Sequence, residues 1–455
     1  MKIGYLPLYI KLYDDGGTNR DVMETFYHET ADIFESKGFE VERADFCRIK
    51  EEFKAAISHF ENAGVDAIVT WHAAYSPSLE SIDALTETDL PIIVFDSTPT
   101  LEFGMQQDPS EIGANHGIHG VMDMCSMLKR HGKAYAIAAG HCENSNVIDK
   151  VCGFVRAAVV AKKLSGMKVG LVGGSFEGMG DFLIPPSEMK ERFGISVETI
   201  EAEKLAKLKE SITSEEVEKE IAEDKLLYDF NDDVVPSEYS EFTHYCLTLR
   251  KCIEQEKYGA FSVNFLNAEV LGTMPFMECC KAMERGIGYA GEGDALTAAF
   301  TGALLSAYPD TSFVEIFCPD WKNNMVFLSH MGEMNYRIAD GKPCVSRVKT
   351  SLVKGAKPYA GYSRMKAGKG VYVNISRDKD DFQLLLADAE ILSAENDSFK
   401  GSMRGWMRSS CSSTEEFLKA LSVNGATHHS TFVYGASAEE LEYFGRLLSL
   451  KTIIV

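Results

Sequence analysis

The chain contains 455 residues, of which 45% are hydrophobic and 25% charged, and its formal net charge at pH 7 is −22. A chain of this length is too long for one hydrophobic core and predicts two or three domains, and the composition is that of an ordinary soluble protein. The negative charge repels phosphate, so we expect no nucleic acid and no membrane as partner, and no apolar stretch is long enough to span a bilayer.

Short apolar runs alternate with helical patterns over about the first 140 residues. The runs KIGYLPLYI, DAIVTW, PIIVFD and AYAIAAG are strand-like, and amphipathic stretches such as DVMETFYHETADIFESKG lie between them. Near-continuous apolar strands that alternate with helices predict a parallel sheet covered on both faces. The first segment lacks a signal-peptide layout, and the cysteines include no C-x-x-C pair, so a reducing, cytoplasmic location is expected.

A second unit of strands and helices begins near residue 166, at SGMKVGLVGG, and ISVETIEA and GAFSVNF predict further strands of it. Residues 200–224, rich in Glu and Lys, are most simply a solvated helical face. The cluster VGLVGGSFEGMGDF follows a strand. It lacks both a correctly placed G-x-G-x-x-G pattern and the Gly-Lys-Ser/Thr ending of nucleotide-binding loops, so a tight turn at the strand end is predicted. Met179 and Phe182 in this turn could line a pocket at the carboxyl edge of the sheet.

The sequence texture changes after about residue 310. VEIFCPDWKNNMVFLSH, PYAGYSRM and GVYVNISRD are typical of β-hairpins, with turn residues and no alternating helices. We therefore expect an α/β chain with two parallel-sheet domains and a β-barrel or β-sandwich in its C-terminal third.

One of these hairpins brings a carboxylate and an imidazole together. If the turn is centred between Lys322 and Asn323, Glu315 lies directly opposite His330, with Cβ atoms roughly 5 Å apart. Phe313 lies on the same face, so both polar groups are presented among aromatic rings. A simple cross-strand Glu–His ion pair is the alternative interpretation.

Two further motifs place similar side chains beside glycines or on strands. In GYAGEGDALTAAF, Glu292 stands between two glycines, Asp294 is a good N-cap, and Ala295–Ala303 predicts a helix. A turn leading into that helix is the plain interpretation of the motif. In VNGATHHSTFVYG, His428 and His429 are adjacent in a strand-like run and are expected on opposite faces, so at most one reaches a given site.

Two carboxylates and two imidazoles suit a divalent ion such as Mn²⁺ and leave open positions for water or substrate oxygens. Structural zinc would more often use cysteines, and no cysteine spacing supports it. Each feature taken singly also fits a core histidine or a surface ion pair.

The motifs GYAGEGDALTAAF, TSFVEIF, VFLSHMGE and GATHHSTFV occur in the order and at the separations found in the L-arabinose isomerase family, which the chain resembles over most of its length. The resemblance implies two Rossmann-like domains, residues 1–165 and 166–309, and a C-terminal β-barrel domain, residues 310–455. It implies a divalent metal, usually Mn²⁺, or else Co²⁺ or Mg²⁺. The implied ligands are Glu292, Glu315, His330 and His429.

The resemblance also implies substrate-binding roles for His116, Met179 and Phe265, and a homo-oligomer, trimer or hexamer, whose site a neighbouring subunit completes. The expected activity is that of an aldose–ketose isomerase acting on a small-molecule sugar through a cis-enediol, with Glu292 as base and Glu315 as its partner. The alternative is a non-catalytic sugar-binding or regulatory protein on the same scaffold.

The segments that grip the sugar in this family differ here. GYLPLYIKLYDDGG stands in place of the family's amino-terminal Gly-Ser-Gln-x-Leu-Tyr-Gly segment, and Gly113 stands where a glutamine is expected three residues before His116. The metal-binding motifs are retained while the sugar-contacting segments are changed. The sequence therefore predicts the type of reaction but does not identify the sugar.

Overall fold

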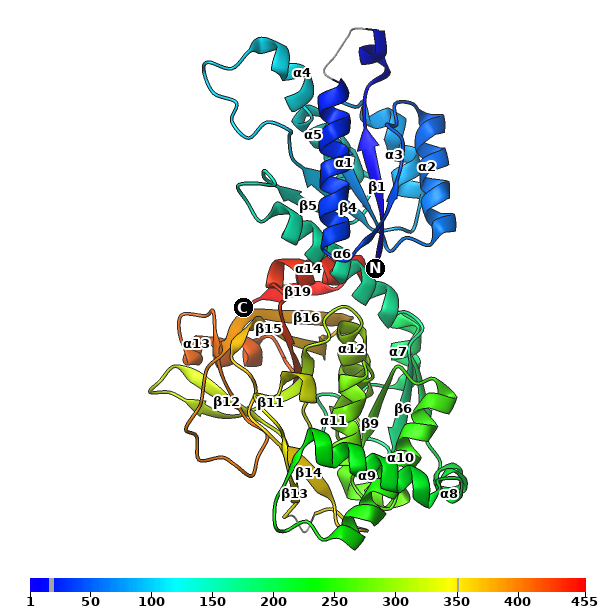
Figure 1. Cartoon of the computed structure of the whole chain (residues 1–455), viewed down its shortest axis with the longest axis vertical. Coiled ribbons are helices and arrows are strands. Elements are labelled where there is room, and N and C mark those ends of the chain that lie inside the picture. Colours follow the sequence, from blue (N-terminus) through cyan, green and yellow to red (C-terminus); the bar gives the residue numbers. More distant parts are fainter. Residues whose placement is uncertain (16–19, 350–351) are drawn as a thin grey trace. The chain divides into compact units, whose positions relative to one another are not determined.

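The computed structural model describes residues 1–15, 20–349 and 352–455, and the chain divides into two compact units (Figure 1). Unit 1 comprises Met1–Lys162 and Glu439–Ser449, and unit 2 comprises Lys163–Ala438 and Leu450–Val455. Unit 2 contains both the second parallel sheet and the β-barrel, and the boundaries of the three domains expected from the sequence stay a prediction. The final two glycines of GYLPLYIKLYDDGG lie outside the described residues.

Unit 1 is built on a five-stranded parallel sheet of order β2-β1-β3-β4-β5. Its strands are β1 (Lys2–Leu8), β2 (Glu40–Arg43), β3 (Ala67–His72), β4 (Ile92–Asp96) and β5 (Tyr135–Ala139). Its longer helices are α1 (Arg20–Ser36), α2 (Lys50–Ala63), α3 (Ser78–Glu87), α5 (Ile118–Arg130), α6 (Val147–Leu164) and α14 (Ala438–Leu447), and the short α4 (Ile112–Asn115) precedes α5. The four strands expected from apolar runs are confirmed, and β2 was missed because its sequence, EVER, is polar and only partly buried.

The helix α14 completes unit 1 from the far end of the chain. Its Tyr443 packs edge-on against Phe154 of α6 with ring centroids 5.7 Å apart, and the Tyr443 hydroxyl donates a hydrogen bond of 3.0 Å to the Ile92 carbonyl of β4. A Cβ at Gly153 would lie 2.1 Å from the Glu440 carboxyl group. Gly153 thus leaves room for the Glu440 side chain of α14 against α6.

Unit 2 begins with a four-stranded parallel sheet of order β10-β9-β6-β7. Its strands are β6 (Lys168–Val172), β7 (Ser196–Thr199), β9 (Ala260–Val263) and β10 (Gly288–Gly291). Its helices are α7 (Pro186–Phe193), α8 (Ala202–Glu210), α9 (Ser214–Leu227), α10 (Pro236–Glu256), α11 (Phe276–Glu284) and α12 (Ala295–Leu305). The two parallel sheets predicted from the sequence are confirmed.

The charged segment 200–224 is helical, but the prediction of a solvated face is wrong for part of it. Glu220 and Asp224 of α9 are 8% and 2% exposed. Both carboxylates pair with the ammonium group of Lys281, and Glu220 also accepts a 2.7 Å hydrogen bond from Arg250. Burial is tolerated here because each charge faces an opposite charge from a neighbouring helix.

The C-terminal part of unit 2 is a barrel of six antiparallel strands, as predicted. The order is β15-β18-β11-β12-β17-β16, and pairing of β15 with β16 closes it. Its strands are β11 (Thr311–Asp320), β12 (Met325–Ser329), β15 (Gly368–Arg377), β16 (Phe382–Ile391), β17 (Gly405–Ser409) and β18 (His429–Tyr434). Outside the barrel lie the parallel strand β19 (Lys451–Ile454), the helix α13 (Thr414–Val423) and a small sheet of β8 (Asp229–Phe230), β13 (Cys344–Arg347) and β14 (Tyr359–Tyr362).

The helix α12 packs between the parallel sheet and the barrel and contacts both. It contacts β9 and β10 on one side and β11 and β18 on the other, and all of its residues are buried. A Cβ at Gly288 would lie 2.2 Å from the Ala298 carbonyl oxygen, so β10 and α12 approach closely only because glycine stands there. The N-terminus of α12 is thereby placed where β10 ends and the barrel strands pass.

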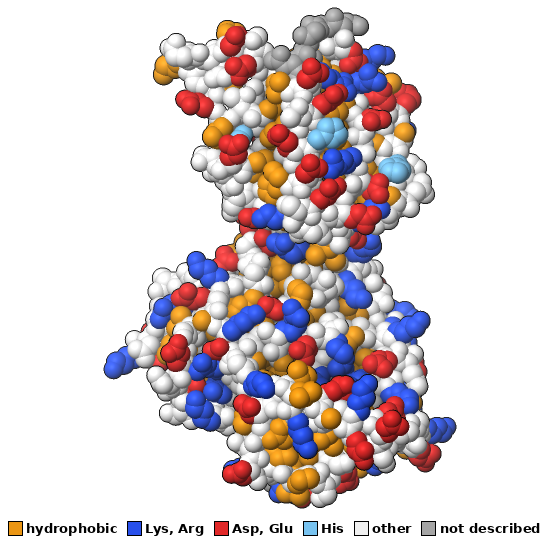
Figure 2. Space-filling model, in the orientation of Figure 1, with side chains coloured by type: hydrophobic (Ala, Val, Ile, Leu, Met, Phe, Trp, Pro, Cys, Tyr) orange, Lys and Arg blue, Asp and Glu red, His pale blue; other side chains and the backbone are white. Residues whose placement is uncertain are grey.

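None of the helices in the described part of the chain is long and apolar enough to cross a membrane. On the face in Figure 2, acidic and basic side chains are interspersed over both units.

Candidate metal centre

The structure brings the four predicted metal ligands together in unit 2. Glu292 lies in the turn between β10 and α12, Glu315 in β11, His330 directly after β12, and His429 at the start of β18. The Glu292 Oε2 and His429 Nε2 atoms are 3.5 Å apart, and Glu315 Oε2 and His330 Nε2 are 3.6 Å apart. Within the described residues, two groups have ligand atoms within 4.8 Å of one another: Glu315, His330 and His429, and Glu292, His428 and His429.

The turn that carries Glu292 needs both of its glycines. Glu292 itself has a φ of 63° and Gly293 a φ of 86°, both in the left-handed region that disfavours side chains. A Cβ at Gly291 would lie 2.9 Å from Cε1 of His330, and one at Gly293 would lie 2.3 Å from the carbonyl oxygen of Gly174. Gly291 therefore makes room for a predicted ligand, and Gly293 lets the turn pass close to the loop after β6.

The hairpin of β11 and β12 differs from its predicted register near the site. Beside the turn the pairing is as predicted, but a β-bulge at Phe317 shifts it, and Glu315 pairs with Ser329. The expected direct opposition of Glu315 and His330 is therefore wrong. The two groups still approach each other, because His330 follows the last strand residue and its ring turns back toward Glu315.

The prediction that only one of the two adjacent histidines reaches the site is also wrong. The strand β18 begins at His429, and His428 lies in the bend before it, so the alternation of a strand does not apply to the pair. The Nε2 atom of His428 is 3.6 Å from Glu292 Oε2, close to the 3.5 Å of His429. His428 is thus a residue of this site that the sequence interpretation missed, although the His-His pair was its signal.

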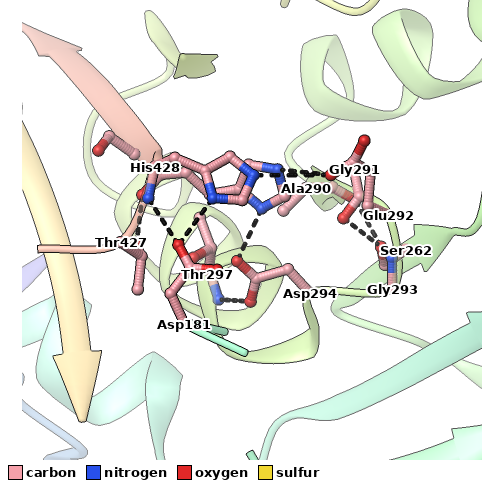
Figure 3. A network of polar contacts seen from close by, with 12 residues as sticks. Asp181, Ser262, Ala290, Gly291, Glu292, Gly293, Asp294, Thr297, Thr427 and His428 are labelled. Atoms are coloured by element: carbon pink, nitrogen blue, oxygen red, sulfur yellow. Dashed lines mark hydrogen bonds and ion pairs between the residues drawn. The ribbon is translucent and has the colours of Figure 1, made fainter. Parts of the chain in front are cut away.

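A carboxylate stands behind each imidazole and was not foreseen in this role. The pairs join a carboxylate oxygen to Nδ1 of the ring, and they are Asp294 and His429 at 3.0 Å, Glu333 and His330 at 2.6 Å, and Asp181 and His428 at 2.7 Å. A carboxylate at Nδ1 fixes the ring and leaves Nε2 to face the centre, as outer carboxylates do behind metal-bound histidines. Figure 3 shows part of this network, with Asp181 and Asp294 below the imidazoles and Glu292 to their right.

Two of these carboxylates are themselves held by buried donors. Glu333 accepts hydrogen bonds from the Tyr289 hydroxyl, at 2.8 Å, and from the Gly332 amide, at 2.9 Å. Asp294 is the predicted N-cap of α12 and accepts a 2.9 Å hydrogen bond from the Thr297 amide. The same carboxylate therefore caps the N-terminus of α12 and orients His429.

The two predicted acid–base carboxylates have different electrostatic surroundings. Burial by itself raises the pKa of Glu292, but the ion pairs with His428 and His429 outweigh burial and lower this pKa to about 2. Burial also raises the pKa of Glu315, and there the nearby histidines only reduce the rise. Glu292 is therefore the more firmly ionised of the two.

The donor set fits a divalent ion. His429 is fully buried, and its Nε2 atom makes no hydrogen bond within the described residues, although the Glu292 carboxylate lies 3.5 Å away. A buried nitrogen without a partner is costly unless something binds it, and two carboxylates with imidazoles form a ligand set that suits Mn²⁺. The residues that would hold the ion are Glu292, Glu315, His330 and His429.

The three predicted substrate-binding residues are distributed over both units. Phe265 follows β9 and lies 5.7 Å, between ring centroids, from Phe176, whose amide donates a 2.8 Å hydrogen bond to the Glu292 carbonyl. Met179 is partly buried in the loop between β6 and α7. His116 belongs to unit 1, where its Nε2 atom is 2.9 Å from the Tyr13 hydroxyl. Their substrate roles stay a prediction.

Two substitutions of Asp294 separate its two contacts. Asp294→Ala is expected to lower the free energy of unfolding by about 1 kcal/mol through loss of the N-cap and to weaken Mn²⁺ binding about tenfold. Asp294→Ser keeps an N-cap acceptor, so we expect near-normal stability with the same tenfold weaker Mn²⁺ binding. Urea-induced unfolding and calorimetric titration with Mn²⁺ measure the two effects. Wild-type Mn²⁺ affinity in Asp294→Ser would show that the carboxylate does not orient His429.

Two family models match the chain, one described as L-arabinose isomerase central domain over residues 187–307 and one as L-arabinose isomerase C-terminal domain over residues 310–451. The L-arabinose isomerase of Shouchella clausii is 24% identical over 417 residues, which cover 90% of this chain and 84% of that protein. That of Aeromonas salmonicida is 22% identical over 400 residues, which cover 85% and 80%.

Among solved structures, a periplasmic solute binding protein from Actinobacillus succinogenes with bound D-allose covers 67% of this chain and 91% of its own. It is 13% identical to this chain, with a TM-score of 0.18. The two family models follow each other along the sequence and together match more than half of it, with the relatives aligned over most of its length. The chain belongs to the L-arabinose isomerase family.

Proposed function

We propose that the protein is a metal-dependent aldose–ketose isomerase. The observation that carries the proposal is the presence of two adjoining groups that share His429, one with Glu292 and one with Glu315 and His330, and a carboxylate behind each imidazole. Membership of the L-arabinose isomerase family supports it. L-Arabinose, the sugar in the relatives' name, is the first substrate to test, and sugars of related stereochemistry follow because the sugar-contacting segments differ.

The chemistry requires a proton to move between two neighbouring carbons of an open-chain sugar. A divalent ion, when bound, supplies a Lewis acid that polarises the carbonyl group and makes the adjacent C–H more acidic. A carboxylate oxygen of one glutamate, Glu292 or Glu315, takes the proton from C2 and returns it to C1. The O1 oxygen gains a proton as the cis-enediol forms, and the O2 hydroxyl group gives up its proton as the enediol becomes the ketose, with the other glutamate as the relay between them. Glu292 is the expected base and Glu315 its partner.

The surrounding residues hold the sugar in this proposal. Phe265 and Met179 supply the apolar wall of the pocket, and His116 contacts a hydroxyl group of the sugar. We also propose a homo-oligomer, a trimer or hexamer, in which a neighbouring subunit completes the site, as the resemblance to the L-arabinose isomerase family implies. The cytoplasm remains the expected location.

A non-catalytic sugar-binding or regulatory protein is the second candidate. Such a protein needs hydrogen-bonding and aromatic groups for the sugar but no converging carboxylates and imidazoles. The carboxylates behind His330 and His429 favour the isomerase, because a site that only binds a sugar gains little from fixing these two buried imidazoles toward one centre.

Metal-replete protein incubated with a panel of aldoses and ketoses, with and without EDTA, tests the proposal. We expect chelator-sensitive interconversion of at least one aldose–ketose pair, since removing the ion removes the polarising group. Chromatographic separation of the sugars measures it. Tight binding of a sugar without bound metal and without conversion would support the non-catalytic alternative.

A further inference from the structure

The loop between β6 and α7 carries Asp181, whose carboxylate forms hydrogen bonds with His428. The Oδ2 atom of Asp181 accepts two hydrogen bonds from this one residue, 2.9 Å from its backbone amide and 2.7 Å from its ring Nδ1. The two contacts fix both the backbone and the ring of His428 (Figure 3). The Nε2 atom is then directed toward Glu292, at 3.6 Å from its Oε2.

The base of this loop is tied to the turn that carries Glu292. The Ser175 hydroxyl donates a 3.0 Å hydrogen bond to the Gly293 carbonyl, and the Phe176 amide donates one of 2.8 Å to the Glu292 carbonyl. Farther along the loop, the ring of Phe182 stacks on His429 with centroids 4.8 Å apart and an interplanar angle of 10°. Asp181 is therefore presented from a segment anchored on both sides of it.

The three imidazoles at the centre differ in exposure. The side chains of His429 and His330 are 0% and 4% exposed, whereas that of His428 is 35% exposed. A molecule that enters from solvent can therefore meet the His428 ring directly, while the other two rings are covered by protein. His428 combines a fixed orientation with access for a ligand.

We propose that Asp181 is a positioning residue, which holds the Nε2 atom of His428 toward a hydroxyl group of the sugar and keeps this histidine outside the metal ligand set. The inference rests on the proposed function. Because the Asp181 carboxylate occupies Nδ1, Nε2 is the ring atom that remains for a ligand, and a sugar hydroxyl group, which can both donate and accept a hydrogen bond, matches it. The chain then uses two adjacent histidines for two tasks: His429 ligates the ion and His428 binds the sugar.

Metal binding separates these tasks without any sugar. Metal-depleted wild type, His428→Ala and His429→Ala are titrated with Mn²⁺ by calorimetry. We expect the Kd of His428→Ala to stay within about threefold of wild type, whereas His429→Ala loses at least about fiftyfold. A loss in His428→Ala as large as that in His429→Ala overturns the inference, because His428 would then be a ligand.

Steady-state kinetics test the link from Asp181 to the sugar, with the sugar that wild type converts in the panel. Asp181→Ala is expected to raise KM about tenfold while kcat changes by less than about threefold, the pattern of a lost binding contact. Asp181→Asn retains an oxygen acceptor and should restore part of the KM. Glu177→Ala, which removes an exposed carboxylate from the same loop, is the matched control and should match wild type.

The outcomes distinguish the inference from the function on which it rests. Conversion by wild type together with an unchanged KM in Asp181→Ala overturns the inference and leaves the isomerase proposal intact. The same holds if Asp181→Ala lowers the melting temperature and kcat but leaves KM unchanged, since Asp181 would then only stabilise the loop. No conversion by wild type overturns the proposed function, and the inference with it.

Discussion

Replacement of Glu315 by glutamine is expected to lower kcat by about a thousandfold and to weaken Mn²⁺ binding. The amide has nearly the same shape, so the pairing of β11 with its neighbours should persist. It can neither accept and return a proton nor match the carboxylate as a ligand. Assays of sugar interconversion, together with Mn²⁺ titration by calorimetry, measure both consequences.

Glu292→Gln in the same assays separates the two carboxylates. The variant that loses turnover but still binds Mn²⁺ identifies the residue that carries the proton, and the variant that loses both identifies a ligand. Glu390→Gln, in β16 of the same barrel, is the control and should behave as wild type. Near-normal turnover of Glu315→Gln would remove Glu315 from the reaction.

Gly293→Ala is expected to lower the free energy of unfolding by about 3 kcal/mol and to reduce Mn²⁺ affinity as well. The added Cβ would meet the Gly174 carbonyl oxygen at 2.3 Å, and the residue has a φ of 86°. Left-handed strain contributes about 1 kcal/mol of the loss, and the steric overlap contributes the rest. Because the same turn presents Glu292, its displacement moves a predicted ligand. Urea-induced unfolding and calorimetry measure the two effects.

Gly286→Ala provides the matched control for this substitution. Gly286 has a φ of 84°, almost the same as that of Gly293, but a Cβ there would have no heavy atom within 4 Å. We expect it to cost only about 1 kcal/mol and to leave Mn²⁺ binding unchanged. Equal losses in the two variants would show that the approach of the turn to Gly174 is not a tight constraint.

The fold could be predicted where a segment carries its own pattern. The buried strands of unit 1 are near-continuous apolar runs, and the change of texture after residue 310 marks the barrel. The strand β10 was not identified because its sequence, GYAG, is typical of a turn. Its conformation depends on pairing with β9, an earlier strand, and on close packing against α12, and neither contact leaves a strand-like pattern in these four residues.

In the candidate site, too, local sequence patterns predicted some features, whereas others depend on tertiary packing. The hairpin spacing correctly placed Glu315 near His330. Nothing in the local sequence indicates the β-bulge at Phe317, which changes the pairing of the two strands. Asp181 and Glu333 approach their histidines only through tertiary packing or a turn, so neither could be recognised from spacing to the histidine it orients. Sequence patterns predicted the groups that converge, and the structure supplied what orients them.

The contribution of α14 to unit 1 bears on how the protein is made. The ribosome releases residues 1–162 long before Glu439–Ser449, yet the hydroxyl of Tyr443 and the packing of Phe154 belong to the same compact unit. Unit 1 therefore keeps an uncovered surface on α6 until the second parallel sheet and all six barrel strands have been synthesised. A chain interrupted before residue 439 leaves that surface exposed, and such nascent products are natural clients for chaperones.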